Sequence, residues 1–316
     1  MALKQVIEIC DFLERPVIDI RQLKKIFLAR GLEEREFGSH KIRGDKAETQ
    51  FVKIRLRGRS AGSKEKRVPT LGIIGRLGGV GARPHKLGLV SDADGAITAL
   101  ACALKLTDMR SRGDALNGQV IIATHLSPRS PVIPHDPVPF MGAPVSMAVM
   151  NRFEVDQEMD AILSIDATKG NRVINHRGFA ISPTVKDGYI LRVSEELLDI
   201  MQTVTGRLPV VFPVTTQDIT PYGNGLYHLN SIMQPATATH APVVGVAITT
   251  EAAVPGCATG ANQPLDIEMA VRFCIEAAKA LGEGKCSFYD HREFKKLISL
   301  YGSFEHLKKP TKKGRD

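Results

Sequence analysis

The chain has 316 residues, of which 43% are hydrophobic, so it can bury a large core as one large domain or two modest ones. No apolar run approaches the roughly 20 residues that a membrane-spanning helix needs, and the N-terminus lacks a signal-peptide core and cleavage site. The formal net charge is +8, but aromatic residues make up only 5% and no nucleic-acid-binding module is recognisable, so nucleic acid is not favoured as a partner.

Short apolar strands alternate with amphipathic helices along most of the chain. In order, the pattern predicts helices at 3–14 and 20–31, strands at 49–56 and 68–74, a helix at 95–107, strands at 119–124 and 159–165, a helix at 195–205, strands at 208–214 and 242–248, and a helix at 265–281. Residues 127–144 contain too many prolines for a regular element. This alternation predicts a three-layer αβα fold with a mainly parallel central sheet.

We expect three parts. Residues 1–44 form an N-terminal helical segment packing on the core, 45–282 form the α/β domain, and 283–316 form a C-terminal helical extension with a basic tail. The five cysteines show no paired spacing, and Cys102 and Cys274 sit in apolar helical patterns. An odd number without a framework indicates a reduced, cytoplasmic protein.

Polar residues gather where the predicted strands end. In open α/β sheets, ligands bind outside the carboxyl ends of the strands, so these residues are the candidates for a site. They are Arg76, Gly78 and Gly79 after 68–74, His125 after 119–124, Asp166 after 159–165, Glu251 after 242–248, and Asp92, Asp94, His135 and Asp136 in the loops.

Several of these residues also have a structural interpretation. Ser91, Asp92 and Asp94 precede a helix, where they could cap its free amides or hold a divalent cation. Arg76 suits either an anion or a salt bridge, and His125 either a metal or a satisfied place in the core. His240 and Cys257 are expected to be structural.

The order of elements over residues 45–282 resembles that of the co-catalytic zinc exopeptidases, and within that clan the chain is identified as a member of the domain-of-unknown-function family 1177. In the clan, a strand ends in His-x-Asp, a bridging Asp opens a helix, a Glu-Glu pair follows the next strand, another Asp ends a strand, and a C-terminal His completes two metal sites. The resemblance places Asp92 at the bridging Asp, Asp166 at the later Asp, and His135 and Asp136 at the Glu-Glu pair.

Two positions depart from that pattern. Arg76 stands where the clan has the His of His-x-Asp, and residues 254–260 (VPGCATG) lack the C-terminal His. The resemblance therefore implies a partly degenerate site in which Asp92, Asp166 and His125 hold a divalent metal, with zinc preferred, and His135 and Asp136 are catalytic. Arg76, Gly78, Gly79 and Glu251 would bind substrate. Either the site holds at most one metal, which we favour, or Arg76 turns away and pairs with an acid elsewhere.

The function implied is metal-dependent hydrolysis of an amide or peptide-like bond in a small substrate. The alternative is a non-catalytic or metal-free protein that binds a small anion on the same fold. A homo-oligomer is compatible with either function.

Overall fold

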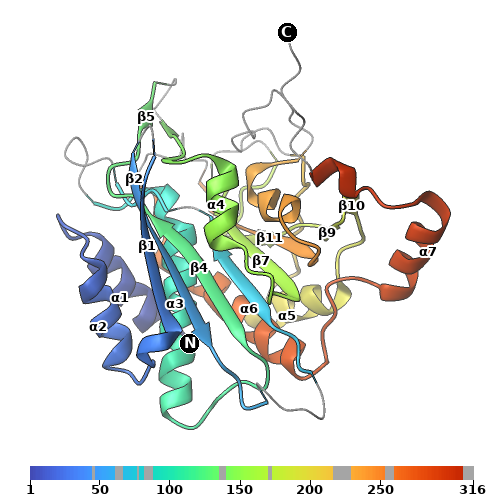
Figure 1. Ribbon diagram of the computed structural model, residues 1–316, viewed down its shortest axis with the longest axis horizontal. Helices are drawn as coiled ribbons and strands as arrows, with labels where there is room; N and C mark the ends of the chain where they lie inside the picture. The colour runs from blue at the N-terminus through green and yellow to red at the C-terminus, as the bar shows by residue number, and fades with distance from the viewer. Residues whose placement is uncertain are drawn as a thin grey trace.

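The computed structural model describes residues 1–44, 47–60, 67–76, 78–81, 88–134, 140–169, 173–215, 229–252 and 260–308. Within these residues, nine strands form one twisted sheet, and helices cover both of its faces (Figure 1). The prediction of a three-layer αβα fold with a mainly parallel central sheet is confirmed.

The centre of the sheet is parallel and runs in the order β4-β3-β7-β11. Every residue of β3, β4 and β11 is buried, as expected for strands covered on both faces, which read as continuous apolar runs. All four strands lie in the sheet and near the positions that the sequence predicts. Their bounds are β3 (Leu71–Gly75), β4 (Val120–Leu126), β7 (Ala161–Ala167) and β11 (Val243–Thr249).

Antiparallel strands extend the sheet on both sides. On one side, β2 (Glu48–Leu56) pairs with β4, and β1 (Phe37–Arg43) pairs with β2. The segment 1–44, expected to be helical, thus also supplies an edge strand. On the other side, β8 (Gly178–Ile181) and β9 (Val185–Lys186) pair with β11, and β10 (Tyr189–Ile190) pairs with β9.

Alternate side chains of each strand enter different cores. Leu71 and Ile73 of β3 join the core beneath the long helices, whereas Ile74 joins the core on the opposite face. The first face carries α1 (Leu3–Leu13), α2 (Ile20–Leu28), α3 (Asp94–Ser111), α5 (Glu195–Thr205) and α6 (Pro264–Gly282). The second carries α4 (Met147–Glu154) and the 3-10 helix η3 (Ser231–Thr237), and Figure 1 shows α4 in front of the sheet with α3 and α6 behind.

Shorter elements complete the described chain. The 3-10 helix η1 (Glu34–Glu36) precedes β1, η2 (Ser91–Ala93) leads into α3, and α7 (His291–Tyr301) and η4 (Glu305–Lys308) follow α6. In the proline-rich segment 127–144, expected to be irregular, β5 (Val132–Ile133) and β6 (Phe140–Met141) form a two-stranded ribbon.

The strand predicted at 208–214 is wrong. Only Val211 forms a bridge, with Ile181. Pro209 and Pro213 lack the amide hydrogen that a ladder needs, so this stretch cannot pair along its length. None of the helices in the described ranges is both long and apolar enough to cross a membrane.

Candidate functional site at the carboxyl edge of the sheet

Three of the predicted site residues form a row at the carboxyl edge. Gly75 pairs with Thr124 of β4 on one side and with Ile165 of β7 on the other. The next residues, His125, Arg76 and Asp166, therefore lie side by side and point to the face that carries α4 and η3. Since neighbouring strands are about 4.8 Å apart, the backbones of His125 and Asp166 are about 10 Å apart, with Arg76 between them.

Arg76 pairs with a buried acid. Its guanidinium forms an ion pair with Glu154 at the end of α4, and the two side chains are only 3% and 0% exposed. Nη2 also donates to Gln234 Oε1 at 2.8 Å. The structure thus pairs Arg76 with an acid, as in the second of the two arrangements considered, but Arg76 does not turn away, because it stays on the same face as His125 and Asp166. No pattern in the sequence pointed to Glu154 as its partner. Through these contacts, Arg76 connects α4 and η3 to the carboxyl ends of the central strands.

His125 shares the same acid. Its Nδ1 lies 2.6 Å from Glu154 Oε1. Because Glu154 is paired with Arg76, its carboxylate accepts and Nδ1 donates, which leaves Nε2 as the acceptor nitrogen. Metal-binding histidines commonly donate their other ring N–H to a carboxylate, so this pair suits a ligand as well as a core histidine.

Asp92 and Asp166 come from elements that touch. Asp92 is the middle residue of η2, and η2 contacts β7, whose penultimate residue is Asp166. Both residues are buried, at 7% and 5% exposure, and Asp166 Oδ1 accepts the amide of Ala167 at 2.7 Å. Two carboxylates are therefore held at the same edge, where divalent cations find the oxygen ligands that they prefer.

Asp94 belongs to a separate buried cluster. It forms an ion pair with Lys169, and Asn262 Nδ2 donates to its Oδ1 at 2.5 Å. Burial raises the pKa of Asp94, while Lys169 and Asn262 lower it. The N-cap of α3 is Ala93, which has no capping side chain. The carboxylate of Asp94 thus serves a contact between distant segments.

Asp266 at the start of α6 should make stability depend on pH. Burial raises its pKa from 3.8 to about 6, against the opposing charges of Lys169 and Arg177. Between about pH 4 and pH 6 the folded state keeps a proton that the unfolded state releases, so the contribution of Asp266 to the unfolding free energy falls as pH rises. We expect Asp266→Asn to stabilise the protein more at pH 7 than at pH 4, by about 1–2 kcal/mol after solvent screening.

Urea denaturation at both pH values measures this difference. The exposed carboxyl of Asp199 provides the control, because Asp199→Asn should give the same small change at each pH. An equal effect of Asp266→Asn at pH 4 and pH 7 would show that the Asp266 carboxyl titrates normally.

The glycines after β3 allow close packing. A Cβ atom on Gly78 would lie 1.9 Å from the carbonyl oxygen of His125, and one on Gly79 would lie 3.3 Å from Asp92 Cβ. One on Gly75 would lie 2.3 Å from the carbonyl oxygen of Gly95 at the start of α3. Protein atoms fill these spaces, so packing accounts for the glycines without a ligand.

The remaining predicted residues are scattered or outside the description. Glu251 is exposed just beyond β11, and His240 lies before β11, away from the carboxyl edge. His135, Asp136 and Cys257 lie outside the described residues.

Burial raises the pKa of the Cys10 and Cys286 thiols to about 12, so neither is a nucleophile near neutral pH.

One group of possible metal ligands lies elsewhere. Among the residues that the structure describes, donor atoms of Asp187, His240 and Glu305 all fall within 4.8 Å of one another, whereas those of Asp92, Asp166 and His125 do not. However, the ammonium groups of Lys308 and Lys186 already bind the Asp187 carboxylate. Two fixed positive charges repel a cation, so we interpret this group as an ion-pair cluster that fastens η4 to the turn between β9 and β10.

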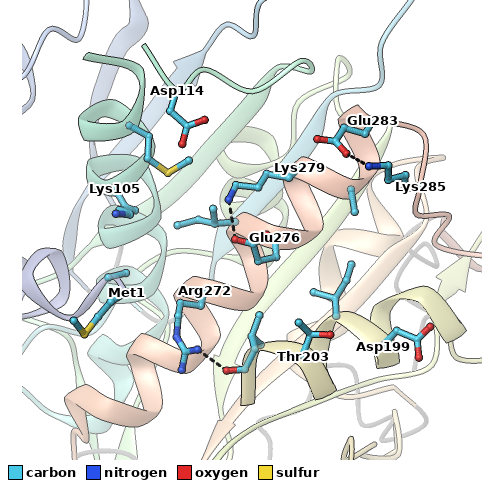
Figure 2. A pocket seen from close by; sticks show the side chains of 16 residues that line it. Met1, Lys105, Asp114, Asp199, Thr203, Arg272, Glu276, Lys279, Glu283 and Lys285 are labelled. Atoms are coloured by element: carbon cyan, nitrogen blue, oxygen red, sulfur yellow. Dashed lines mark hydrogen bonds and ion pairs between the residues drawn. The ribbon is translucent and has the colours of Figure 1, made fainter. Parts of the chain in front are cut away.

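A groove of about 650 Å³ opens between α3, α5 and α6 (Figure 2). It is lined by Lys105 and Met109 from the second half of α3 and by Arg272 and Glu276 from α6. The groove therefore lies at the end of α3 opposite to Asp94, the residue that begins the helix at the carboxyl edge. The charges in the groove are partly paired within α6, as in Lys279–Glu276, and the groove contains none of the predicted site residues.

The chain is similar to known proteins in its structure. No curated protein matches the sequence. A glutaminyl cyclase from an Acidobacteriales bacterium has a similar structure, with 11% identity, a TM-score of 0.52, and coverage of 90% of this chain and 94% of the cyclase. A tomato leucine aminopeptidase variant matches with 10% identity and a TM-score of 0.47 over 86% of this chain, which spans 60% of that enzyme's length.

A family model matches most of the sequence. Residues 40–311 match the family described as "Protein of unknown function (DUF1177)". The fold and the family match agree with the resemblance inferred from the order of elements over residues 45–282. The chain therefore belongs to the DUF1177 family, and its fold is zinc-exopeptidase-like.

Proposed function

We propose that this protein hydrolyses an amide or peptide-like bond in a small substrate, with one divalent cation bound at the carboxyl edge through Asp92 and Asp166. His125 is proposed as the third ligand through Nε2; in this structure the donor atoms of Asp92, Asp166 and His125 do not all lie within 4.8 Å of one another, so binding draws these side chains together. Zinc is the preferred ion because it accepts carboxylate and imidazole ligands together. The observation that carries this proposal is the pair of buried carboxylates brought to one edge by η2 and β7, which contact each other.

The donor set suits one cation. Arg76 takes the place of a clan ligand, and its charge is compensated by Glu154, so a neighbouring cation meets a neutral pair instead of a bare guanidinium. A second cation would lack both the His of His-x-Asp and the C-terminal His. A divalent cation at this edge supplies Lewis-acid chemistry to a carbonyl group.

The other roles in the reaction are assigned to side chains of the protein. Asp92 and Asp166 bind the cation, Glu154 orients the His125 ring through Nδ1, and His135 or Asp136 takes the proton of the attacking water. The alternative function, a metal-free protein that binds a small anion, requires an Arg76 guanidinium that an anion can reach. A guanidinium that is 3% exposed and bound to Glu154 and Gln234 does not favour it.

Chelation tests this proposal. We expect the protein to hydrolyse at least one member of a panel of aminoacyl and N-acyl amide substrates. Treatment with 1,10-phenanthroline should abolish that activity, and zinc should restore it. Asp166→Asn should remain inactive after zinc addition while keeping its melting temperature, because the amide preserves the shape of the side chain but loses its charge.

Asp199→Asn serves as the matched control, since Asp199 is an exposed carboxylate on α5 far from the edge. It should behave as wild type in every step. Hydrolysis that survives chelation, or that Asp166→Asn retains, would refute the metal-dependent mechanism.

A further inference from the structure

A buried lysine connects the two segments that carry Asp92 and Asp166. Lys169 lies three residues after Asp166, and Asp94 lies two residues after Asp92. Their side chains form an ion pair and are 3% and 0% exposed. Lys169 Nζ also donates to the carbonyl oxygen of Ala261 at 2.7 Å. The chain after β7 is thus fastened to the start of α3 and to the segment before α6.

Asn262 holds η2 at both of its ends. Its Nδ2 donates to Asp94 Oδ1 at 2.5 Å and to the carbonyl oxygen of Val90 at 2.8 Å. Val90 directly precedes η2, and Asp94 directly follows it. Because η2 is only three residues long, fixing both flanks leaves Asp92 little freedom.

Stability alone does not explain this arrangement. Replacing a buried ion pair with apolar residues of similar volume is often neutral or stabilising, whereas removing one partner is costly. The apolar contacts of α3 with β3, β4 and β7 already hold the helix on the sheet. The polar contacts add a defined relative position, because each hydrogen bond fixes a distance and an angle between segments that are far apart in sequence.

We propose that Asp94, Lys169 and Asn262 form a positioning clamp that sets Asp92 of η2 against Asp166 of β7 so that the two carboxylates can share one cation. This inference rests on the proposed function for its purpose, but the fixing of η2 is a property of the apo protein. Groups that orient metal ligands typically change metal affinity by about 10–100-fold when they are removed.

The main test replaces both members of the ion pair. The double variant Asp94→Asn, Lys169→Met should keep most of its stability because no unpaired charge is left. Hydrogen exchange at residues 90–95 should become at least about tenfold faster, and Co²⁺ affinity should fall by about 10–100-fold with a changed visible spectrum. Asn262→Ala, which leaves the ion pair intact, should speed up exchange in the same segment.

The matched control lies at the opposite end of α3. Arg110 and Glu36 form an ion pair there, with 22% and 4% exposure, and the double variant Arg110→Met, Glu36→Gln should leave exchange at 90–95 and Co²⁺ binding unchanged. The clamp is refuted if neither clamp variant alters exchange at 90–95 relative to this control. It is equally refuted if Co²⁺ affinity, abolished by Asp92→Asn, is unchanged in the clamp double variant. If wild type binds no Co²⁺, the proposed function fails, and exchange alone decides whether the clamp fixes η2.

Discussion

Glu154→Gln should lower the free energy of unfolding by about 3–5 kcal/mol, the usual cost of leaving a buried charge without its partner. The guanidinium of Arg76 cannot release its proton at physiological pH, so it would stay charged among side chains that exclude water. Gln234 and Asn151 supply only neutral acceptors. Urea denaturation at pH 7 measures the loss.

Glu283→Gln provides the control for this substitution. It breaks the pair between Glu283 and Lys285, whose side chains are 42% and 74% exposed, so water and salt screen it and its loss should change stability little. A loss for Glu154→Gln as small as that of the control would mean that Arg76 is solvated or paired otherwise. Glu154 is also the acceptor of His125 Nδ1, so the same variant should weaken metal binding.

Gly78→Ala should destabilise the protein by about 3 kcal/mol or more, because a well-packed site has no room for an added methyl group. The new Cβ would lie 1.9 Å from the carbonyl oxygen of His125 and 2.5 Å from His125 Cδ2. Neither segment can retreat easily, since the amide of Ser127 donates to the carbonyl oxygen of Gly78 at 2.7 Å. The chain after β3 must therefore separate from β4.

Gly38→Ala in the edge strand β1 is the comparison. Its Cβ would meet only the carbonyl oxygen of Lys53, at the ordinary contact distance of 3.6 Å. Thermal unfolding should show a large decrease in melting temperature for Gly78→Ala and little change for Gly38→Ala. Similar melting temperatures for the two variants would contradict the close packing between Gly78 and His125.

The central sheet and most helices could be predicted from hydrophobic periodicity. Buried strands such as β11 and amphipathic helices such as α5 leave local patterns that a sequence displays directly. The edge strand β1, with the sequence FGSHKIR, leaves a weaker pattern because most of it faces water. The helix α4 follows a proline-rich stretch and is only eight residues long, which gives periodicity little room to show.

The position of the candidate site residues in the sheet was predictable, but their contacts were not. The rule that ligands collect at carboxyl ends of strands brought Arg76, His125 and Asp166 to one edge. The partners Glu154 and Lys169 could not be found in this way, because Arg76 and Glu154 are 78 residues apart and any of the chain's acids could have been the partner. Such pairings depend on tertiary packing.

The number of zinc ions per chain tests the central claim most directly. After reconstitution with zinc and removal of the excess, elemental analysis should find one ion per chain in wild type and in Asp199→Asn. Asp92→Asn and Asp166→Asn should each bind none while remaining folded by circular dichroism. Two ions per chain, none in wild type, or one retained in both variants would contradict a single cation held by Asp92 and Asp166 beside the Arg76–Glu154 pair.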